Sequence, residues 1–446
     1  MIAIDKSPPP AVSPLIADSA AIEELTEVEL DKFNVTYSLT GGYIKKIIIK
    51  PYGEELNFYD IGFMPEHKGI LFTLRQESEN RVVLESREAK VKKEWEFNQY
   101  HIAVKIDLGQ ESGPVVLFSN PLSDNGLEQR YQEVFYQKSK SSLISRKAQR
   151  GVKDLEEDGL ALVGARDRYF CIAFYNHDFP GTFKRDKNVV IASSIANNGG
   201  IYNFYLGPQT INQLKEYGLE KIVYYGFFHS IGLTIIKTLY FFKKLTNSWG
   251  ISVLLLSFLI YFILFPFTAQ STKAMKRMQE IQPEIQELQK KYKDNPQKMQ
   301  KEQLELFRKH KVNPLGGCLP MFLQFPVFIA LYQALFRFVA LKGASFLWIK
   351  DLSLPDRTIA LPFSLPYFGN FINILPLIIL AINYFKQKIT TQTGNQQQQS
   401  TQKIFVLLIG IIFYHFPSCL VLYWLVQNSL TFLYQYKISR PSIAVR

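Results

Sequence analysis

The placement of apolar residues along the chain limits the possible folds more than any other feature. Up to about Leu245 apolar and polar residues are mixed, but beyond Trp249 the apolar residues gather into long runs with few charges. Such runs are typical of helices that cross a bilayer. They are Ile251–Thr268, Leu315–Phe336, Ile372–Phe385, Ile404–Phe416 and Leu420–Tyr434. The pattern therefore predicts a soluble half followed, at residues 249–436, by an α-helical membrane core of five spans.

The fourth run is short for a complete crossing. The 14 residues from Lys403 to Phe416 extend about 21 Å as a helix, whereas the hydrocarbon core is about 30 Å thick. Either the bilayer thins at this helix or the helix begins in a polar inlet.

Basic residues are unevenly distributed among the segments between these runs. Residues 269–313 hold eleven Lys and Arg, and residues 386–403 hold three with no acid. The alternating segment Arg337–Pro362 carries acids beside its basic residues, and the turn Pro417–Ser418 carries no charge. Because cytoplasmic segments are enriched in Lys and Arg, we expect a multi-pass membrane protein. Its soluble half is expected outside the cytoplasm and its tail, residues 437–446, inside it, so the net charge of +12 reflects topology rather than a nucleic-acid partner.

The soluble half shows the two-residue alternation of β-strands. Within residues 25–212, short alternating segments such as Tyr43–Ile49 and Tyr202–Leu206 are separated by turns rich in Gly and Pro. This spacing predicts an all-β antiparallel super-sandwich. Residues 1–24 are rich in Pro, Ala and Ser and are interpreted as a linker.

No catalytic constellation is visible in the soluble half. His67, His101 and His177 are isolated, and no nucleophile motif or phosphate-binding glycine loop accompanies them. The three cysteines of the chain are far apart and lack the spacing of a zinc site or a disulfide framework. We therefore expect no enzymatic activity, no metal and no cofactor.

Residues 213–248 are predicted to connect the two halves through helices. Residues 211–217 form a short helical pattern, and residues 227–244 carry apolar residues on most faces together with Lys237, Lys243 and Lys244. The second segment is compatible with a first span. We favour an interfacial amphipathic helix, because lysine stems can lie along apolar surface while their ammonium groups reach water.

The basic segment 269–313 is predicted to form a cytoplasmic hairpin of two helices, broken at Lys293–Pro296. Its apolar residues recur at helical spacing opposite a Glu and Lys face. The hairpin either packs on itself or docks nascent chains, ribosomes or anionic phospholipids. The candidate docking residues are Lys273, Met275, Lys276, Arg277, Met278, Lys290 and Lys291.

Two dense motifs give the membrane half a family resemblance. Residues 313–332, NPLGGCLPMFLQFPVFIALY, and residues 416–428, FPSCLVLYWLVQN, resemble the signatures of YidC-type membrane protein insertases of bacteria, which have relatives in mitochondria and chloroplasts. Trp249-Gly250, residues 265–268 and residues 347–352 match as well. In the soluble half, residues 41–44 and 205–208 resemble weaker landmarks of the family's periplasmic domain.

The resemblance implies an insertase and chaperone of the cell inner membrane with a periplasmic β domain. Its five helices enclose a hydrophilic groove open to the cytoplasm and to lipid. A nascent membrane protein enters the groove by its polar segment and releases its apolar segment into the membrane, with the insertase working alone or beside the Sec translocon. Relatives with this domain usually have one more helix before it, so we expect a span upstream of Met1.

The groove of this chain departs from the family pattern at one position. Where family members commonly carry an arginine in the first core span, this sequence has Tyr261. We therefore expect a groove made polar by neutral groups, although each of these side chains can equally serve interhelical packing. The candidate groove residues are Ser257, Tyr261, Gln324, Tyr423, Trp424, Gln427 and Asn428.

Three other functions fit the sequence less well. A small-solute transporter, the main alternative, requires ionisable groups or broken helices near the membrane midplane, and the spans offer few. A sugar-modifying enzyme requires a paired acid and base, which cannot be placed in the β half. A nucleic-acid binder rests on charge alone, and the charge follows the topology.

Overall fold

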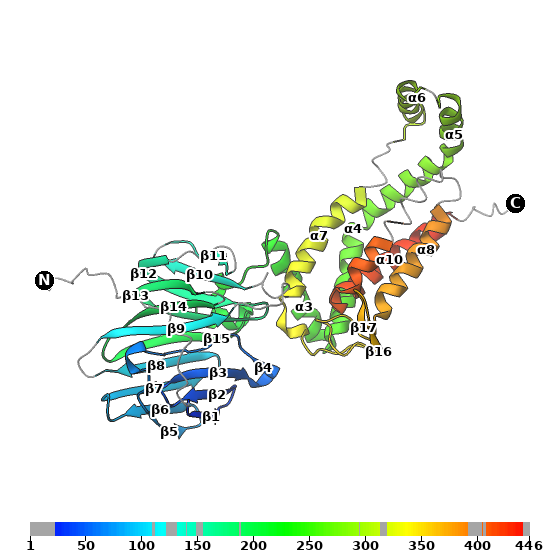
Figure 1. Ribbon diagram of the computed structural model, residues 1–446. Coiled ribbons are helices and arrows are strands. Elements are labelled where there is room, and N and C mark those ends of the chain that lie inside the picture. The colour runs from blue at the N-terminus through cyan, green and yellow to red at the C-terminus, as the bar shows by residue number, and fades with distance from the viewer. Residues whose placement is uncertain are drawn as a thin grey trace. The chain divides into compact units, whose positions relative to one another are not determined.

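The computed structural model describes residues 23–108, 112–121, 132–139, 141–148, 155–186, 189–293, 295–312, 319–390, 404 and 407–439. Several predicted features lie outside these residues: most of the linker 1–24, the start of the motif at Asn313, residues 391–403 and the tail from 440. The chain divides into two compact units, Met1–Val223 and Tyr224–Arg446 (Figure 1). We call them the β unit and the helical unit.

The β unit contains fifteen described strands. They are β1 (Leu25–Glu29), β2 (Phe33–Ser38), β3 (Tyr43–Ile49), β4 (Glu54–Glu55), β5 (Thr73–Ser78), β6 (Arg81–Ser86), β7 (Val91–Asn98), β8 (His101–Asp107), β9 (Gly113–Pro121), β10 (Glu133–Lys138), β11 (Ile144–Lys147), β12 (Leu155–Arg166), β13 (Phe170–Asp186), β14 (Val189–Ala196) and β15 (Gly200–Pro208). The unit ends in α2 (Ile211–Glu216) and the 3₁₀ turn η3 (Glu220–Ile222). The predicted antiparallel β architecture is confirmed.

These strands form two antiparallel sheets that pack on one another. The small sheet has the order β1-β2-β3-β4, and the large sheet runs β11-β10-β12-β13-β15-β8-β7-β6-β5, with β14 joining β13 to β9. Phe33 and Tyr37 on β2 meet Phe97 and Trp95 on β7, with ring centroids 6.0 and 6.2 Å apart. The two-residue alternation of β7 buries every second side chain, so one face of that strand supplies the core between the sheets.

One of the core-facing positions of β7 is occupied by a lysine instead of an apolar residue. Lys93 occupies a core-facing position of β7 and is fully buried. Its Nζ donates to the backbone carbonyl oxygens of Gly42 at 2.8 Å, Gly62 at 2.9 Å and Gly41 at 3.3 Å. All three glycines have positive φ, which a residue with a Cβ adopts at a cost. Lys93 therefore joins two glycine turns to the large sheet, and burial lowers the pKa of its amine to about 7.

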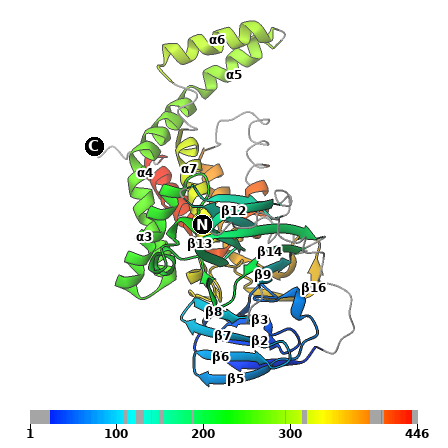
Figure 2. The ribbon, with the colours of Figure 1, turned by 90° about the vertical axis from the view of Figure 1, so that its left-hand side faces the viewer.

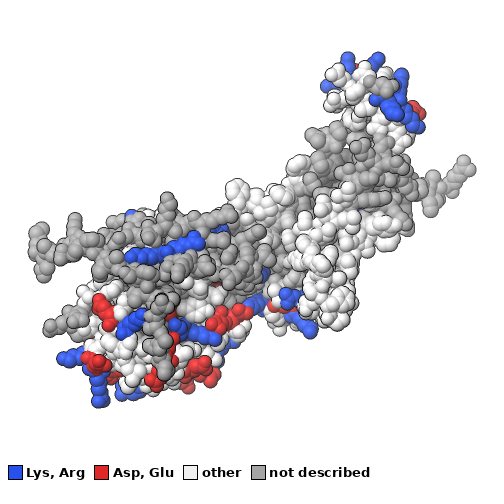
Figure 3. Space-filling view, viewed as in Figure 1, with Lys and Arg blue, Asp and Glu red and all other residues white. Residues whose placement is uncertain are grey.

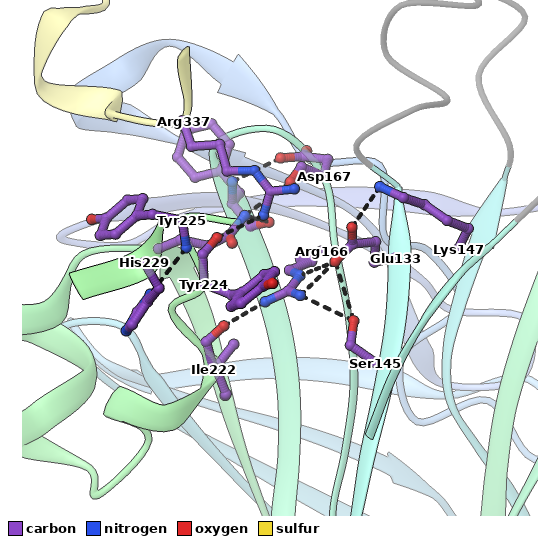
Figure 4. Close-up of polar contacts among 12 residues, drawn as sticks. Glu133, Ser145, Lys147, Arg166, Asp167, Ile222, Tyr224, Tyr225, His229 and Arg337 are labelled. Carbon is purple, nitrogen blue, oxygen red and sulfur yellow. Dashed lines mark hydrogen bonds and ion pairs between the residues drawn. The ribbon is translucent and has the colours of Figure 1, made fainter. Parts of the chain in front are cut away.

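A buried ion pair fixes the C-terminal end of the β unit. Arg166, at the end of β12, is 1% exposed, and its Nε donates to Glu133 on β10 at 2.9 Å. The same guanidinium donates to the hydroxyl of Ser145 at 3.0 Å and to the backbone oxygen of Ile222. Lys147 reaches Glu133 at 2.6 Å (Figure 4). One arginine therefore connects β10, β11 and β12 to the last turn before the unit ends.

Among the described residues, the helical unit has seven labelled α-helices and two strands. It also has one 3₁₀ turn, η5 (Val339–Leu341). The helices and strands are α3 (His229–Thr246), α4 (Trp249–Glu280), α5 (Gln282–Lys291), α6 (Pro296–Lys309), α7 (Leu319–Phe336), β16 (Ile359–Leu365), β17 (Gly369–Ile372), α8 (Ile374–Thr390) and α10 (Ser418–Ser439). Residues 407–414 are also helical. Helix α4 packs against α3, α7 and α10, and α10 packs against α8.

Among the described residues, one helix is long and apolar enough to cross a membrane. It is α4, with 32 residues, and shorter apolar helices cover Gln324–Phe336 and Ile374–Gln387. The five-span count therefore stays a prediction.

The hairpin begins later along the chain than predicted. Helix α4 runs through Ala269 without a break and continues to Glu280, because no proline or glycine occurs between Ala269 and Pro283. Proline lacks the N–H that the next helical hydrogen bond needs, so a new helix begins at Gln282. Helices α5 and α6 then lie side by side at the end of α4 (Figures 1 and 2). The predicted break at Lys293–Pro296 is confirmed, since α6 begins at Pro296.

A small β-hairpin stands where the sequence predicted a loop. Strands β16 and β17 pair in antiparallel register from Ile359↔Ile372 to Leu365↔Gly369. The turn contains Tyr367 and Gly369, both at positive φ. Pro362 and Pro366 interrupt the strand pattern in this segment, which explains why alternation did not reveal it.

Candidate functional site: a polar cavity among the helices

The described part of the helical unit encloses a cavity of about 320 Å³ among α4, α7, α8 and α10. Each wall comes from one face of a helix, since the lining positions recur every three or four residues. The lining residues are Leu264, Phe267, Thr268, Ser271, Thr272 and Met275 of α4, Gln324, Phe325 and Phe328 of α7, Lys386 of α8, and Trp424, Gln427, Asn428, Thr431 and Gln435 of α10. The α4 wall belongs to the half of that helix that leads into α5.

The polar groups of the cavity hold one another across different helices. Gln427 donates from Nε2 to the backbone oxygen of Ser257 on α4 at 2.9 Å. Gln324 on α7 donates to the hydroxyl of Tyr423 on α10. These bonds stabilise the helix packing while leaving amide and hydroxyl groups at the cavity wall, which is a surface able to hydrogen-bond a polar peptide segment.

The structure brings together some of the predicted groove residues and separates others from the cavity. Gln324, Trp424, Gln427 and Asn428 line it. Tyr423 is fully buried and reaches the lining only through Gln324. Ser257 is also fully buried, and its hydroxyl donates to the Val253 backbone oxygen of its own helix at 2.6 Å.

Tyr261 likewise lies in packing rather than in the cavity wall. Its side chain is 5% exposed, and its ring meets that of Phe265 at 5.8 Å between centroids. It is not among the described lining residues. Helix α4 therefore contributes mainly hydroxyl and apolar side chains to the cavity, all of them between Leu264 and Met275.

Sequence reasoning missed one cavity residue, Lys386. The apolar run ends at Phe385, and we assigned Lys386 to the following loop, but α8 continues to Thr390. Lys386 lies half-buried in the cavity wall, with Nζ 3.2 Å from Oδ1 of Asn428 on α10. Asn383, Lys386 and Gln387 share a helical face, and this spacing is the signal that could have revealed it.

The hairpin packs part of its apolar face on itself. Ile281, Ile285, Leu306 and Val312 form a small core, and Met278 packs against it. Met275, predicted as a docking residue, is instead part of the cavity wall. The basic docking candidates are exposed: Lys273, Lys276, Arg277, Lys290 and Lys291. Lys and Arg gather over α5 and α6 on the face drawn in Figure 3, so the hairpin combines a closed apolar core with a basic surface.

Two further contacts order the start of the helical unit. The guanidinium of Arg337 donates from Nη1 to the backbone oxygen of Tyr224 at 3.0 Å. The backbone N–H of Tyr225 donates to Nδ1 of His229, the first residue of α3, at 3.2 Å (Figure 4). The segment that precedes α3 is therefore tied to both α3 and the end of α7.

His67 and His101 of the β unit lie in structural contacts. His67 is buried beside the ring of Phe72, and burial together with the charge of Lys93 lowers the pKa of its imidazole to about 4. His101 contacts Oδ1 of Asn203 at 3.2 Å and stacks on Tyr217. The β unit also has a cavity of about 480 Å³ bordered by Tyr175, Asn203 and Tyr217. Its described lining residues include no carboxylate.

Comparison with known proteins shows what the helical unit is similar to. Residues 241–444 match the family model described as 60Kd inner membrane protein. The YidC membrane protein insertase of Endomicrobium trichonymphae is 40% identical over 242 residues, which is 53% of this chain and 45% of that protein. The YidC of Geobacter sulfurreducens is 34% identical over 310 residues, covering 65% of this chain and 56% of the relative. The chain thus spans about half the length of these curated relatives.

Solved structures are similar over most of the chain but at low sequence identity. A crystal structure of an active YidC insertase with its first transmembrane domain resolved is 18% identical, with 93% of this chain and 95% of that chain covered and a TM-score of 0.48. The crystal structure of YidC from Thermotoga maritima is 14% identical, covers 92% and 99%, and has a TM-score of 0.37.

Proposed function

We propose that this chain, whose residues 241–444 match the model of the 60Kd inner membrane protein family and whose relatives are YidC insertases, inserts nascent membrane proteins into the bacterial inner membrane. The polar segment of a substrate enters the cavity among α4, α7, α8 and α10, while its apolar segment passes into the bilayer. Burial of about twenty apolar residues in lipid drives the step. No nucleotide, metal or cofactor is needed, and no covalent chemistry takes place.

The observation that carries this proposal is a polar wall inside an apolar helix bundle. Gln324, Gln427 and Asn428 face the same cavity from α7 and α10. Moving one amide from water into hydrocarbon costs about 2–7 kcal/mol when it finds no hydrogen-bond partner. A cavity that offers such partners partway across the membrane lowers this cost for the polar segment of a substrate.

The position of the cavity along α4 supports a cytoplasmic opening. Its α4 wall lies toward the end that leads into the basic hairpin, and basic segments favour the cytoplasmic side. Five spans then leave the β unit in the periplasm and the C-terminus in the cytoplasm. The exposed basic residues of the hairpin support contacts with anionic phospholipids and with the ribosome. Function alone or beside the Sec translocon is compatible with this arrangement.

Site-specific photocrosslinking tests the proposal. A photoreactive phenylalanine replaces Phe328 or Trp424, which line the cavity, or Phe262, which is 66% exposed on α4 and is not among the described lining residues. The partner is a ribosome-bound nascent chain with one apolar segment behind a short polar tail. We expect the tail to crosslink to the first two positions at least about fivefold more than to Phe262, since only they border the cavity.

Equal crosslinking of the tail from all three positions, or none, would contradict the proposal. Uptake of a small solute into vesicles that contain the purified protein, without protection of any substrate tail, would favour the transporter alternative instead.

A further inference from the structure

The β-hairpin formed by β16 and β17 exposes a group of apolar side chains. Both faces of β16 are open along most of the strand. Phe363 and Tyr367 are 58% and 60% exposed, and Ile359 and Phe368 are exposed as well. No charged residue occurs from Thr358 to Phe385. Aromatic side chains gathered on an uncharged hairpin form a surface that favours contact with another apolar phase.

Hydrogen bonds fix the base of this β-hairpin to the rest of the helical unit. The side chain of Asn373, which follows β17, accepts from the backbone N–H of Arg357 at 2.8 Å and donates to the backbone oxygen of Tyr414 at 2.7 Å. The Tyr414 hydroxyl donates to the backbone oxygen of Phe371 at 2.6 Å. A two-stranded hairpin alone is marginally stable in water, so these contacts hold the exposed tip at a defined place.

The length of α10 separates the β-hairpin from the α5–α6 hairpin by about one bilayer core. At the start of α10, the backbone N–H of Ser418 donates to the oxygen of Leu354, in the connection that leads into β16, at 2.8 Å. Near its end, the oxygen of Ile438 accepts from Lys276, close to the end of α4, at 3.3 Å. The 22 residues of α10 extend about 33 Å, and the hydrocarbon core is about 30 Å thick. The two hairpins therefore lie at the levels of opposite membrane surfaces (Figure 1).

The open edges of the β-hairpin limit how deeply it can enter the membrane. Among the described strands, β16 and β17 pair only with each other, so their outer edges present backbone N–H and C=O groups to the surroundings. Open sheet edges do not occur in the hydrocarbon core, because these groups find no hydrogen-bond partner there. Aromatic side chains favour the boundary between headgroups and acyl chains, where water still reaches the backbone. This boundary suits both the edges and the aromatic side chains.

The neighbouring helix favours lipid over a protein as the phase that covers this surface. An apolar helical segment covers Ile374–Gln387, and α8 begins directly after Asn373. The chain therefore passes from the β-hairpin straight into an apolar helix. A protein interface also has a polar rim whose charges orient the partner, and the segment from Thr358 to the end of β17 carries no charge.

We propose that the β-hairpin lies in the interfacial layer of the membrane surface opposite the α5–α6 hairpin, with Phe363, Tyr367 and Phe368 against the upper acyl chains of phospholipids. This contact holds the connection between α7 and α8, and with it the start of α10, at a fixed depth in the bilayer. The inference goes beyond the proposed function, because the contact needs no substrate. Its test requires no insertion reaction, so its failure is distinct from a failure of the proposed function.

Photocrosslinking to lipid tests the proposal with the full chain in vesicles of phosphatidylethanolamine and phosphatidylglycerol. A photoreactive phenylalanine replaces Phe363 or Phe368, Phe262 on α4 as a lipid-facing reference, or Leu71, which is 55% exposed in the β unit, as the control. After irradiation, peptide mapping by mass spectrometry measures the fraction of each site that carries a phospholipid adduct. We expect the adduct fraction at Phe363 and Phe368 to exceed that at Leu71 at least about fivefold and to lie within about threefold of that at Phe262.

A second substitution separates lipid contact from exposure alone. With the photoreactive group at position 368, Phe363→Gln should lower the adduct fraction about threefold, because it removes one apolar side chain from the lipid layer. Phe363→Leu, the matched control, should change it by less than about 1.5-fold, since the side chain stays apolar. Equal adduct fractions in these two variants would contradict the proposal.

Radical footprinting of the unmodified protein in the same vesicles requires no substitution and decides the point if a variant does not accumulate. Tyr367 is well exposed, whereas Tyr59 in the β unit is half-buried. Hydroxyl radicals generated in water should nevertheless oxidise Tyr367 more slowly than Tyr59, because lipid covers Tyr367. Faster oxidation of Tyr367, or phospholipid adducts at Phe363 and Phe368 no more frequent than at Leu71, overturns the proposal. Crosslinks from the β-hairpin to protein instead of phospholipid also overturn it, since they assign the surface to a protein partner.

Discussion

One described lysine in each unit, Lys93 in the β unit and Lys386 in the helical unit, can be compared, because their surroundings differ. Lys93 is enclosed by the β core and held by three backbone carbonyl oxygens, which cannot move without moving the turns that carry them. Lys386 borders a cavity and contacts a side-chain amide. The β unit thus uses buried charge to fix its own backbone, whereas the helical unit keeps charge at a surface that another molecule can reach.

The largest effect should come from the ion pair at the end of the β unit. Arg166→Met leaves Glu133 buried beside Lys147 and Ser145, which still donate to it, and removes the contact with Ile222. Breaking a buried pair costs about 3–5 kcal/mol. Hydrogen exchange of the full chain should show β10 and β12 losing protection by this amount. Arg168→Met, two residues away, is the control, and comparable losses in both variants would contradict the assigned role.

Lys93→Met should have the next largest effect. It leaves the carbonyl oxygens of Gly41, Gly42 and Gly62 without their buried donor, at about 1–3 kcal/mol for such groups. We expect the β7 amides to lose about 2–3 kcal/mol of protection in exchange experiments. Lys92→Met, on the exposed face of the same strand, should change protection by less than about 0.5 kcal/mol. If the two variants match, Lys93 does not support the turns.

The lowered pKa of Lys93 also predicts a pH dependence. Its folded-state pKa is about 7, against 10.5 for an ordinary lysine. Between these values the unfolded chain binds a proton that the folded chain does not, so stability rises with pH. We expect the β unit to gain roughly 1.5 kcal/mol from pH 7 to 8.5, measured by exchange corrected for its intrinsic pH dependence. The gain should vanish in Lys93→Met; its persistence there would assign it to other groups.

Replacing Lys386 by Met in the helical unit should scarcely affect the stability of that unit. Because Lys386 borders a cavity rather than a closed core, Lys386→Met should alter the protection of α8 and α10 amides by less than about 1 kcal/mol. A loss comparable with that of Lys93→Met would remove the contrast between the two units and make Lys386 a packing residue.

The smallest effect is expected at Tyr261. Its hydroxyl is not needed to line the cavity, since the ring lies in packing beside Phe265. Tyr261→Phe should change the insertion of a single-span substrate with a polar tail by less than about twofold, because an aromatic ring of the same shape remains. Insertion is measured as protection of the tail from added protease. A loss confined to substrates with polar tails would show that the Tyr261 hydroxyl contributes to the groove.

The sequence predicted features that depend on local pattern. Alternation identified strands such as β3, and the proline at position 296 located the start of α6. The neutral polar residues expected in the groove include Gln324, Gln427 and Asn428, which line the cavity. Lys93 escaped prediction because alternation assigns polar residues to the exposed face. Lys386 escaped because its position depends on one further turn of α8 beyond the apolar run, a boundary that hydropathy alone does not fix.

Helix α4 makes the cavity wall and the base of the hairpin parts of one rod. Its 32 residues extend about 48 Å, and the segment from Leu264 to Met275 borders the cavity before the helix reaches α5. Pro266, between the lining residues Leu264 and Phe267, lacks the N–H for one backbone hydrogen bond of this helix. A force on the hairpin would therefore be transmitted along α4 to the cavity wall.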